Sequence, residues 1–84
     1  LKPTFGSFDL IDRVVAFRNA FNEDVEIELC GCMTSICVLA NAVLLRAAMP
    51  NAKITVNSKL CADVSKEKHE AALEVLRSQQ IDVI

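Results

Sequence analysis

The sequence predicts an α/β fold built around a parallel β-sheet, in a single unit of 84 residues. Short apolar runs typical of strands alternate with longer amphipathic stretches typical of helices. Strands that alternate with helices of this length favour right-handed βαβ crossovers, which place successive strands parallel to one another. No linker, repeat or low-complexity segment divides the chain. We therefore expect a Rossmann-like α/β/α arrangement with about three strands and three helices.

The first helix is expected from Phe8 to about Phe21. Ser7 is a suitable N-cap, and Asp9 suits the positive end of the helix dipole in the first turn. A broad apolar stripe at helical spacing supports this assignment. The stripe consists of Leu10, Ile11, Val14, Val15, Phe17 and Phe21.

The rest of the chain follows the same alternation. A strand is expected from Val25 to Cys30, where Glu26 and Glu28 alternate with apolar residues, so that one face of the strand is exposed. Thr34 or Ser35 is expected to cap a largely buried helix that ends near Met49, before a proline. The remaining expected elements are a strand at Lys53–Asn57, a helix that opens at Val64-Ser65 and reaches about Gln79, and a last strand at Ile81–Ile84.

Composition limits the classes of partner and location. Acidic and basic residues are interleaved and the net charge is −2, which gives no sign of a nucleic-acid or anionic-membrane partner. The longest apolar run, Ile36 to Leu45, is interrupted by Asn41 and is shorter than a membrane span, and the N-terminal stretch shows no signal-peptide pattern. We expect a cytoplasmic protein. A hydrophobic fraction of 52% in so short a chain predicts surface that another subunit covers, and hence a homo-oligomer.

The four cysteines differ in their settings. Cys37 lies in the first turn of a predicted helix, where unpaired backbone N–H groups and the helix dipole favour a thiolate. Cys30 and Cys32 form a C-x-C pair at a strand end. Two interpretations stay open for them: a metal or redox pair, or small buried hydrophobic residues. Cys61, expected just after a strand, is interpreted as structural. The spacing does not match paired C-x-x-C zinc sites.

Three segments carry a resemblance to a known family. Gly-Cys-Met-Thr-Ser-Ile-Cys-Val, residues 31–38, resembles the nucleophile segment of the isochorismatase-like cysteine hydrolase superfamily, which includes nicotinamidases and related amidases. Lys-Pro-Thr-Phe-Gly-Ser, residues 2–7, resembles the segment with the family's catalytic lysine. Ser-Lys-Glu-Lys-His-Glu-Ala-Ala-Leu, residues 65–73, resembles its last long helix. The match covers residues 1–84 as the C-terminal portion of a single family domain.

The resemblance implies a set of site residues. Cys37 is implied as the nucleophile and Lys2 as the residue that stabilises its thiolate. The backbone N–H groups of Met33 and Cys37 are implied as the oxyanion hole, aimed by a cis peptide bond between Cys32 and Met33. The family's catalytic aspartate and the metal ligands of its nicotinamidases belong to the opening half of the domain and have no counterpart here. No metal ligand is therefore assigned in this segment, although the complete family domain can hold a divalent metal such as zinc.

The implied function is hydrolysis of a carboxamide C–N bond in a small molecule through a thioester intermediate. Without the aspartate, we expect the chain alone to be weakly active or inactive. One departure from the family is Ser35, where many members carry aspartate. By family topology the strand that ends at Cys30 neighbours a strand outside this segment, so we expect its edge to pair with the missing N-terminal half or with a second copy.

Other interpretations stay open. The chain is alternatively a catalytically inactive α/β fragment that serves as a packing or oligomerisation module, and a C-x-C thiol or metal site is a third hypothesis. His69 falls on the same helical face as Ala72 and Leu73, which favours a packed structural histidine over a base. Asp63 is expected to order the loop before the last helix.

Overall fold

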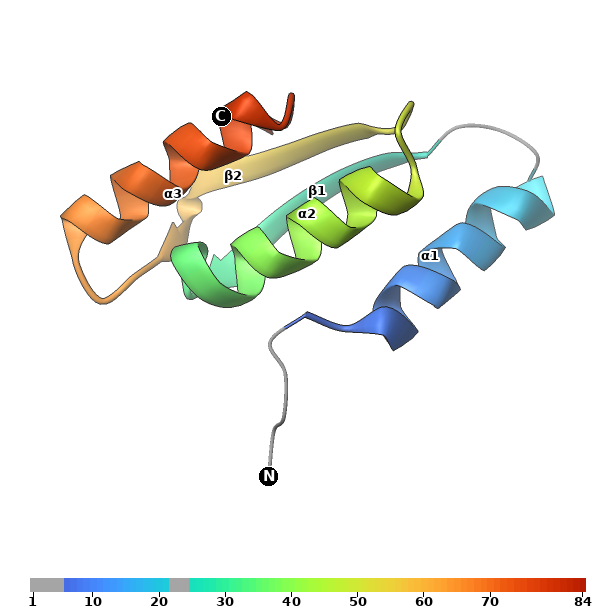
Figure 1. Cartoon of the computed structure of the whole chain (residues 1–84), viewed down its shortest axis with the longest axis horizontal. Coiled ribbons are helices and arrows are strands. Elements are labelled where there is room, and N and C mark those ends of the chain that lie inside the picture. The colour runs from blue at the N-terminus through green and yellow to red at the C-terminus, as the bar shows by residue number, and fades with distance from the viewer. Residues whose placement is uncertain (1–5, 22–24) are drawn as a thin grey trace.

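The computed structural model describes residues 6–21 and 25–84, which form a parallel three-stranded sheet with packed helices (Figure 1). The strands lie in the order β1-β2-β3, and both strand pairs are parallel. In chain order the elements are α1 (Phe8–Phe21), β1 (Glu26–Cys32), the π-helix η1 (Thr34–Val38), α2 (Leu39–Ala48), β2 (Lys53–Ala62), α3 (Lys66–Ser78) and β3 (Asp82–Val83). The predicted class, an incomplete α/β fold on a parallel sheet, is confirmed.

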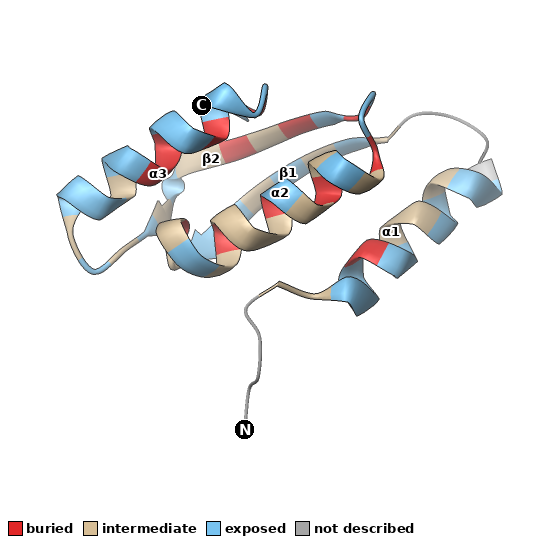
Figure 2. Ribbon diagram, viewed as in Figure 1, coloured by how far each residue is buried: buried red, intermediate tan, exposed pale blue. Residues whose placement is uncertain are grey.

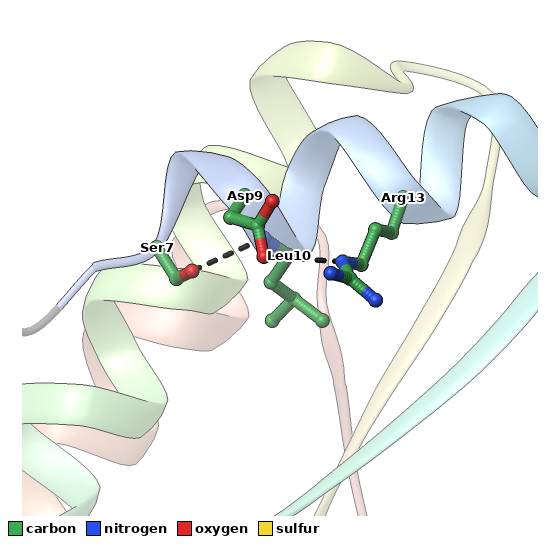
Figure 3. Close-up of polar contacts among 4 residues, drawn as sticks. All are labelled: Ser7, Asp9, Leu10 and Arg13. Carbon is green, nitrogen blue, oxygen red and sulfur yellow. Dashed lines mark hydrogen bonds and ion pairs between the residues drawn. The ribbon is translucent and has the colours of Figure 1, made fainter.

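The helix bounds follow the sequence signals closely. α1 has the predicted bounds, and Ser7 caps it by accepting a hydrogen bond on Oγ from the Leu10 amide at 3.1 Å (Figure 3). An exposed ion pair of 3.1 Å joins Asp9 in the first turn to Arg13, one turn further along the helix. α3 begins after Ser65, whose side chain accepts from the amide of Lys68. Both serine caps satisfy backbone donors that a helix cannot pair internally.

β2 is longer than predicted, because it continues to Ala62 instead of ending at Asn57. Val56 is the partner of Leu29, but the next partners are Gly31 and Cys61, so residues 57–60 bulge out of register with β1. These residues lack the apolar alternation of a strand, which is why the sequence pattern stops before them. Gly31, at the same irregularity, has φ +122°, a conformation that side-chain-bearing residues rarely adopt.

The core lies between the helices and one face of the sheet. Figure 2 shows buried positions along α2, α3 and β2. On β2, Ile54 and Val56 are buried and meet apolar residues of both helices. The largest fully buried apolar side chains are Leu45, Met49, Ile54, Val56, Leu76 and Ile81.

The opposite face of the sheet is polar where the chain is described. Glu26, Glu28 and Lys53 are exposed there, and with Thr55 they line a shallow hollow of about 350 Å³. The predicted alternation of β1 between exposed glutamates and partly buried apolar residues is confirmed. Charged side chains of this kind stay in water rather than beneath a packed helix.

α1 is less well covered than its sequence suggests. Of the predicted apolar stripe, Ile11 is buried and Val14 and Val15 are partly buried, but Phe8 is 74% exposed and Phe17 is 57% exposed. The helix packs against α2 at the side of the molecule away from α3 (Figure 1). Its apolar surface is therefore wider than the surface that α2 offers. No helix in the described ranges is long and apolar enough to cross a membrane.

A matched pair of leucines tests this core. Leu45→Ala removes a side chain that is 1% exposed, and we expect the free energy of unfolding to fall by about 2–5 kcal/mol. Leu60→Ala removes a side chain that is 58% exposed, and we expect a change within about 0.5 kcal/mol. Urea unfolding followed by circular dichroism measures both, and equal losses would contradict the assigned core.

Candidate active site

Cys37, which the sequence predicts to be a nucleophile, lies in the turn that connects β1 to α2. The peptide bond between Cys32 and Met33 is cis, at the bond that the resemblance indicated. Met33 is extended, with φ −87° and ψ 143°, and its carbonyl accepts hydrogen bonds from the amides of Ile36 and Val38. The first turn of the helix is thus π-helical rather than α-helical. This carbonyl fixes the path of the backbone around Cys37.

The expected side-chain cap by Thr34 or Ser35 is wrong. The residue in the cap position is Met33, which has no side-chain cap bond in the described structure. Thr34 is fully buried, and its Oγ1 lies 3.2 Å from the Ala62 carbonyl and 2.8 Å from Nδ1 of His69. A carbonyl only accepts and a hydroxyl has one hydrogen, so the hydroxyl donates to Ala62 and Nδ1 of His69 donates to the hydroxyl. Burial makes both bonds valuable, because an unpaired hydroxyl there would be costly.

His69 is therefore a half-buried residue that binds the turn from α3. This agrees with the preference for a structural histidine over a base. The ring nitrogen contacts the second residue after the cis peptide bond, so His69 supports the turn without being placed on Cys37 itself. The sequence predicted only the helix face on which His69 lies. It did not predict the contact with Thr34, because the two residues are 35 positions apart in the chain.

Asp63 makes a second connection to the same turn. Its Oδ2 accepts from the Ser35 amide at 2.7 Å, and its Oδ1 accepts from the Val64 amide at 2.6 Å. The pKa of the Asp63 carboxyl is lowered chiefly by the Ser35 hydroxyl. The backbone amides of Ser35 and Val64 and the charge of Lys68 lower it further, and burial opposes these effects. Asp63 orders the loop before α3, as expected, but it also binds η1.

Cys37 is half-buried and lines a hollow of about 210 Å³ at the carboxyl end of β1. This is where ligands bind in open α/β sheets. Cys30 and Cys32 line the same hollow, together with Leu29 and Asn41. The described residues include no group of three histidine, cysteine or acidic side chains placed to share a metal ion.

All four cysteines are free thiols, and they differ in environment. Cys30 and Cys32 are exposed, whereas Cys37 and Cys61 are half-buried. Burial raises the pKa of the Cys61 thiol, an effect that the neighbouring Cys30 increases and the backbone of Gly31 opposes. Cys61 lies within β2, so the expectation that it follows a strand is corrected by the greater length of β2.

Asn41 is a site residue that the sequence pattern did not identify. Its Nδ2 donates to the Cys37 carbonyl at 2.8 Å, and its Oδ1 accepts from the Ser7 amide at 2.9 Å. It therefore joins the turn around Cys37 to the segment that precedes α1. A Cβ atom on Gly6 would lie 2.8 Å from Leu44, so this segment also passes close to α2. The only signal in the sequence was an amide side chain in an apolar helix.

Lys2 lies outside the described residues, so the structure does not place it relative to Cys37. The described segment from Gly6 onward reaches the turn around Cys37 through the contact of Ser7 with Asn41. Met33 and Cys37 lie within one turn, and the contacts of Thr34 and Ser35 fix its beginning. Of the residues assigned to the site, the structure describes Cys32, Met33 and Cys37, which lie in the same turn.

Comparisons with known proteins agree with this architecture. The sequence model of the isochorismatase domain family matches residues 2–84. A pyrazinamidase/nicotinamidase from Streptococcus mutans superposes with a TM-score of 0.79 at 27% identity, over 99% of this chain and 44% of that one. No curated protein sequence matches the chain.

Two further solved structures give the same picture. A nicotinamidase from Staphylococcus aureus has a TM-score of 0.78 at 26% identity, over 99% of this chain and 51% of that one. A nicotinamidase from Bacillus subtilis has a TM-score of 0.78 at 28% identity, over 98% of this chain and 44% of that one. The chain thus spans about half the length of these proteins or less. Because the family match extends over nearly all of its residues, the chain belongs to the isochorismatase-like hydrolase family.

Proposed function

We propose that this chain is the nucleophile-bearing part of a cysteine hydrolase that cleaves the carboxamide C–N bond of a small molecule. One observation carries the proposal: Cys37 lines a hollow at the carboxyl end of β1. The backbone of its turn is held by hydrogen bonds to the Met33 carbonyl and from the Ser35 amide to Asp63. The three similar structures described above are nicotinamidases by name, which supports a nicotinamide-like amide as substrate.

The proposed reaction proceeds by nucleophilic acyl transfer. Sγ of Cys37 attacks the carbonyl carbon of the amide and forms a C–S bond, and the carbonyl oxygen becomes an oxyanion. The backbone N–H groups of Met33 and Cys37 stabilise that charge. The C–N bond then breaks and the amine leaves with a proton. Water attacks the thioester, which releases the carboxylic acid and restores the Cys37 thiol.

The remaining parts of the proposed machinery lie elsewhere. Lys2 stabilises the thiolate, and an aspartate from the part of the family domain that this chain does not match moves the protons. A divalent metal such as zinc, where the complete domain holds one, would be bound by residues outside this segment. The outer edge of β1 pairs with that missing half or with a second copy of the chain, and the protein works as a cytoplasmic homo-oligomer. The edge position of β1 supports this pairing, since an edge strand presents unpaired backbone groups.

A second candidate is a packing or oligomerisation module without catalysis. The exposed apolar side chains favour it, among them Phe8, Phe17, Leu60 and Val64. Surface of this kind is usually covered by another protein. The two proposals differ in what they require of Cys37, because a module needs no reactive thiol.

Alkylation separates the two candidates. We expect iodoacetamide at pH 6–7 to modify Cys37 faster than Cys30, Cys32 or Cys61, as measured by peptide mass spectrometry over time. Exposure alone predicts another order, because Cys30 and Cys32 are more exposed than Cys37. Cys37→Ser should abolish the fast reaction and Cys61→Ser should leave it unchanged. Equal rates at all four thiols would contradict the hydrolase and favour the module.

Amide hydrolysis by the chain alone tests the need for the missing aspartate. Loss of a general base lowers rates by about 10²–10⁴-fold, so we expect almost no ammonia release from nicotinamide compared with an intact nicotinamidase. Turnover that disappears in Cys37→Ser would support the nucleophile and contradict the requirement for the aspartate. Turnover that persists in Cys37→Ser would contradict the mechanism.

A further inference from the structure

Asp63 is positioned between two backbone segments that meet at the carboxyl edge of the sheet. It directly follows β2 and precedes α3, and one of its carboxylate oxygens binds the amide of Val64 in its own loop. The other oxygen binds the amide of Ser35 in η1 at 2.7 Å. Bonds of this length to a carboxylate belong to the stronger class of protein hydrogen bonds. The side chain therefore ties the loop after β2 to the turn after β1.

This tie acts on the part of the turn that precedes Cys37. Thr34 is held by the Ala62 carbonyl and His69, and Ser35 is held by Asp63, so two consecutive residues are fixed from the β2–α3 side. Beyond them, the Met33 carbonyl receives the amides of Ile36 and Val38. The orientation of the peptide groups on either side of Cys37 follows from these fixed points. Without Asp63, the Ser35 peptide would lose its partner on the loop side.

We propose that Asp63 is a positioning residue for the Cys37 turn, acting through the Ser35 peptide. The inference rests on the proposed function, and deepens it, because it identifies what holds the nucleophile and its adjoining N–H groups in place. Asp63 does not line the hollow around Cys37, so it acts at a distance from the reacting atoms.

The chemistry of residue 35 fits this role. Ser35 offers both its amide and its hydroxyl as donors to the Asp63 carboxylate. An acidic residue at position 35 would place two carboxylates against each other here. Like charges at hydrogen-bond distance are destabilising unless one of them is neutral. Ser35 and Asp63 are thus a matched pair of donor and acceptor.

Hydrogen exchange of the full chain tests the positioning role. We expect Asp63→Ala to accelerate exchange of the amides of residues 35–38 by about tenfold or more, since a charge-assisted bond is lost. Asp63→Asn, which keeps one acceptor, should give an intermediate rate. Amides within α3, such as that of Leu76, should keep their protection. The control is Asp9→Asn, because Asp9 is an exposed aspartate whose ion pair lies within α1. Faster exchange throughout the chain, or no change at residues 35–38, would overturn the proposal.

The reactivity of Cys37 provides a readout that a merely structural role would not move. We expect Asp63→Ala to change the alkylation rate of Cys37 relative to Cys61 by about threefold or more, and Asp9→Asn to leave the ratio unchanged. An unchanged ratio in Asp63→Ala would overturn the positioning role. Slow alkylation of Cys37 in the unaltered chain would instead contradict the proposed function, so the two failures are distinguishable.

Adding a carboxylate at residue 35, with or without the one at residue 63, gives a third test. Ser35→Asp should lower the midpoint of thermal unfolding, and Ser35→Asp combined with Asp63→Asn should recover most of the loss, because only one carboxylate then remains. Ser35→Ala is the control for loss of the hydroxyl alone. A double variant that is no more stable than Ser35→Asp would contradict the matched pair.

Acid titration follows from the same contacts. The pKa of Asp63 is lowered in the folded chain, chiefly by the Ser35 hydroxyl and then by the amides of Ser35 and Val64 and the charge of Lys68. A carboxyl with a lowered pKa stabilises the folded state above its unfolded pKa and loses that effect as the pH falls through the folded value. The difference in urea midpoint between the unaltered chain and Asp63→Asn should therefore be constant above about pH 5 and shrink in stronger acid. A difference that does not depend on pH would contradict the ionised contact.

Discussion

A buried hydroxyl organises the candidate site. Thr34 is fully buried directly after the Cys32–Met33 peptide, and it is paired with the Ala62 carbonyl and with His69. A buried polar group without such partners would oppose folding. In a parallel sheet the carboxyl ends of neighbouring strands lie at one edge, so the loop after β2 is within reach of the turn after β1. The position of Cys37, the contact of Asp63 and the geometry around Met33 all depend on this connection between two loops.

Local signals in the sequence were enough for much of the architecture. The period and caps of α1 and α3, the glutamate alternation of β1 and the parallel order of the strands all follow from patterns within a few residues. The placement of Cys37 in the first helical turn after β1 was predicted in the same way. These features are local, or follow directly from the succession of local elements.

The features that the sequence did not reveal depend on distant partners. The Ser35–Asp63 contact joins residues 28 apart, and the Asn41–Ser7 contact joins residues 34 apart. Thr34 and Ser35 have the chemistry of helix caps, but their partners across the sheet edge gave them other roles. Likewise, the apolar stripe of α1 indicated a buried helix face, whereas only part of it meets α2. Residue type shows what a side chain can bind, but the packed structure determines which partner it meets.

The bulge in β2 has a consequence for length variation in this family domain. Residues 57–60 form a spacer between the pairing that ends at Val56 and the pairing that resumes at Cys61. Because residues 57–60 lie opposite Cys30 alone, removing one of them would leave the pairing up to Val56 and the pairing from Cys61 onward in register. Such a deletion would keep Ala62 beside Cys32, and with it the contacts of Ala62 and Asp63 to Thr34 and Ser35. This spacer is therefore a place where the domain can change length without altering the register that supports the turn around Cys37.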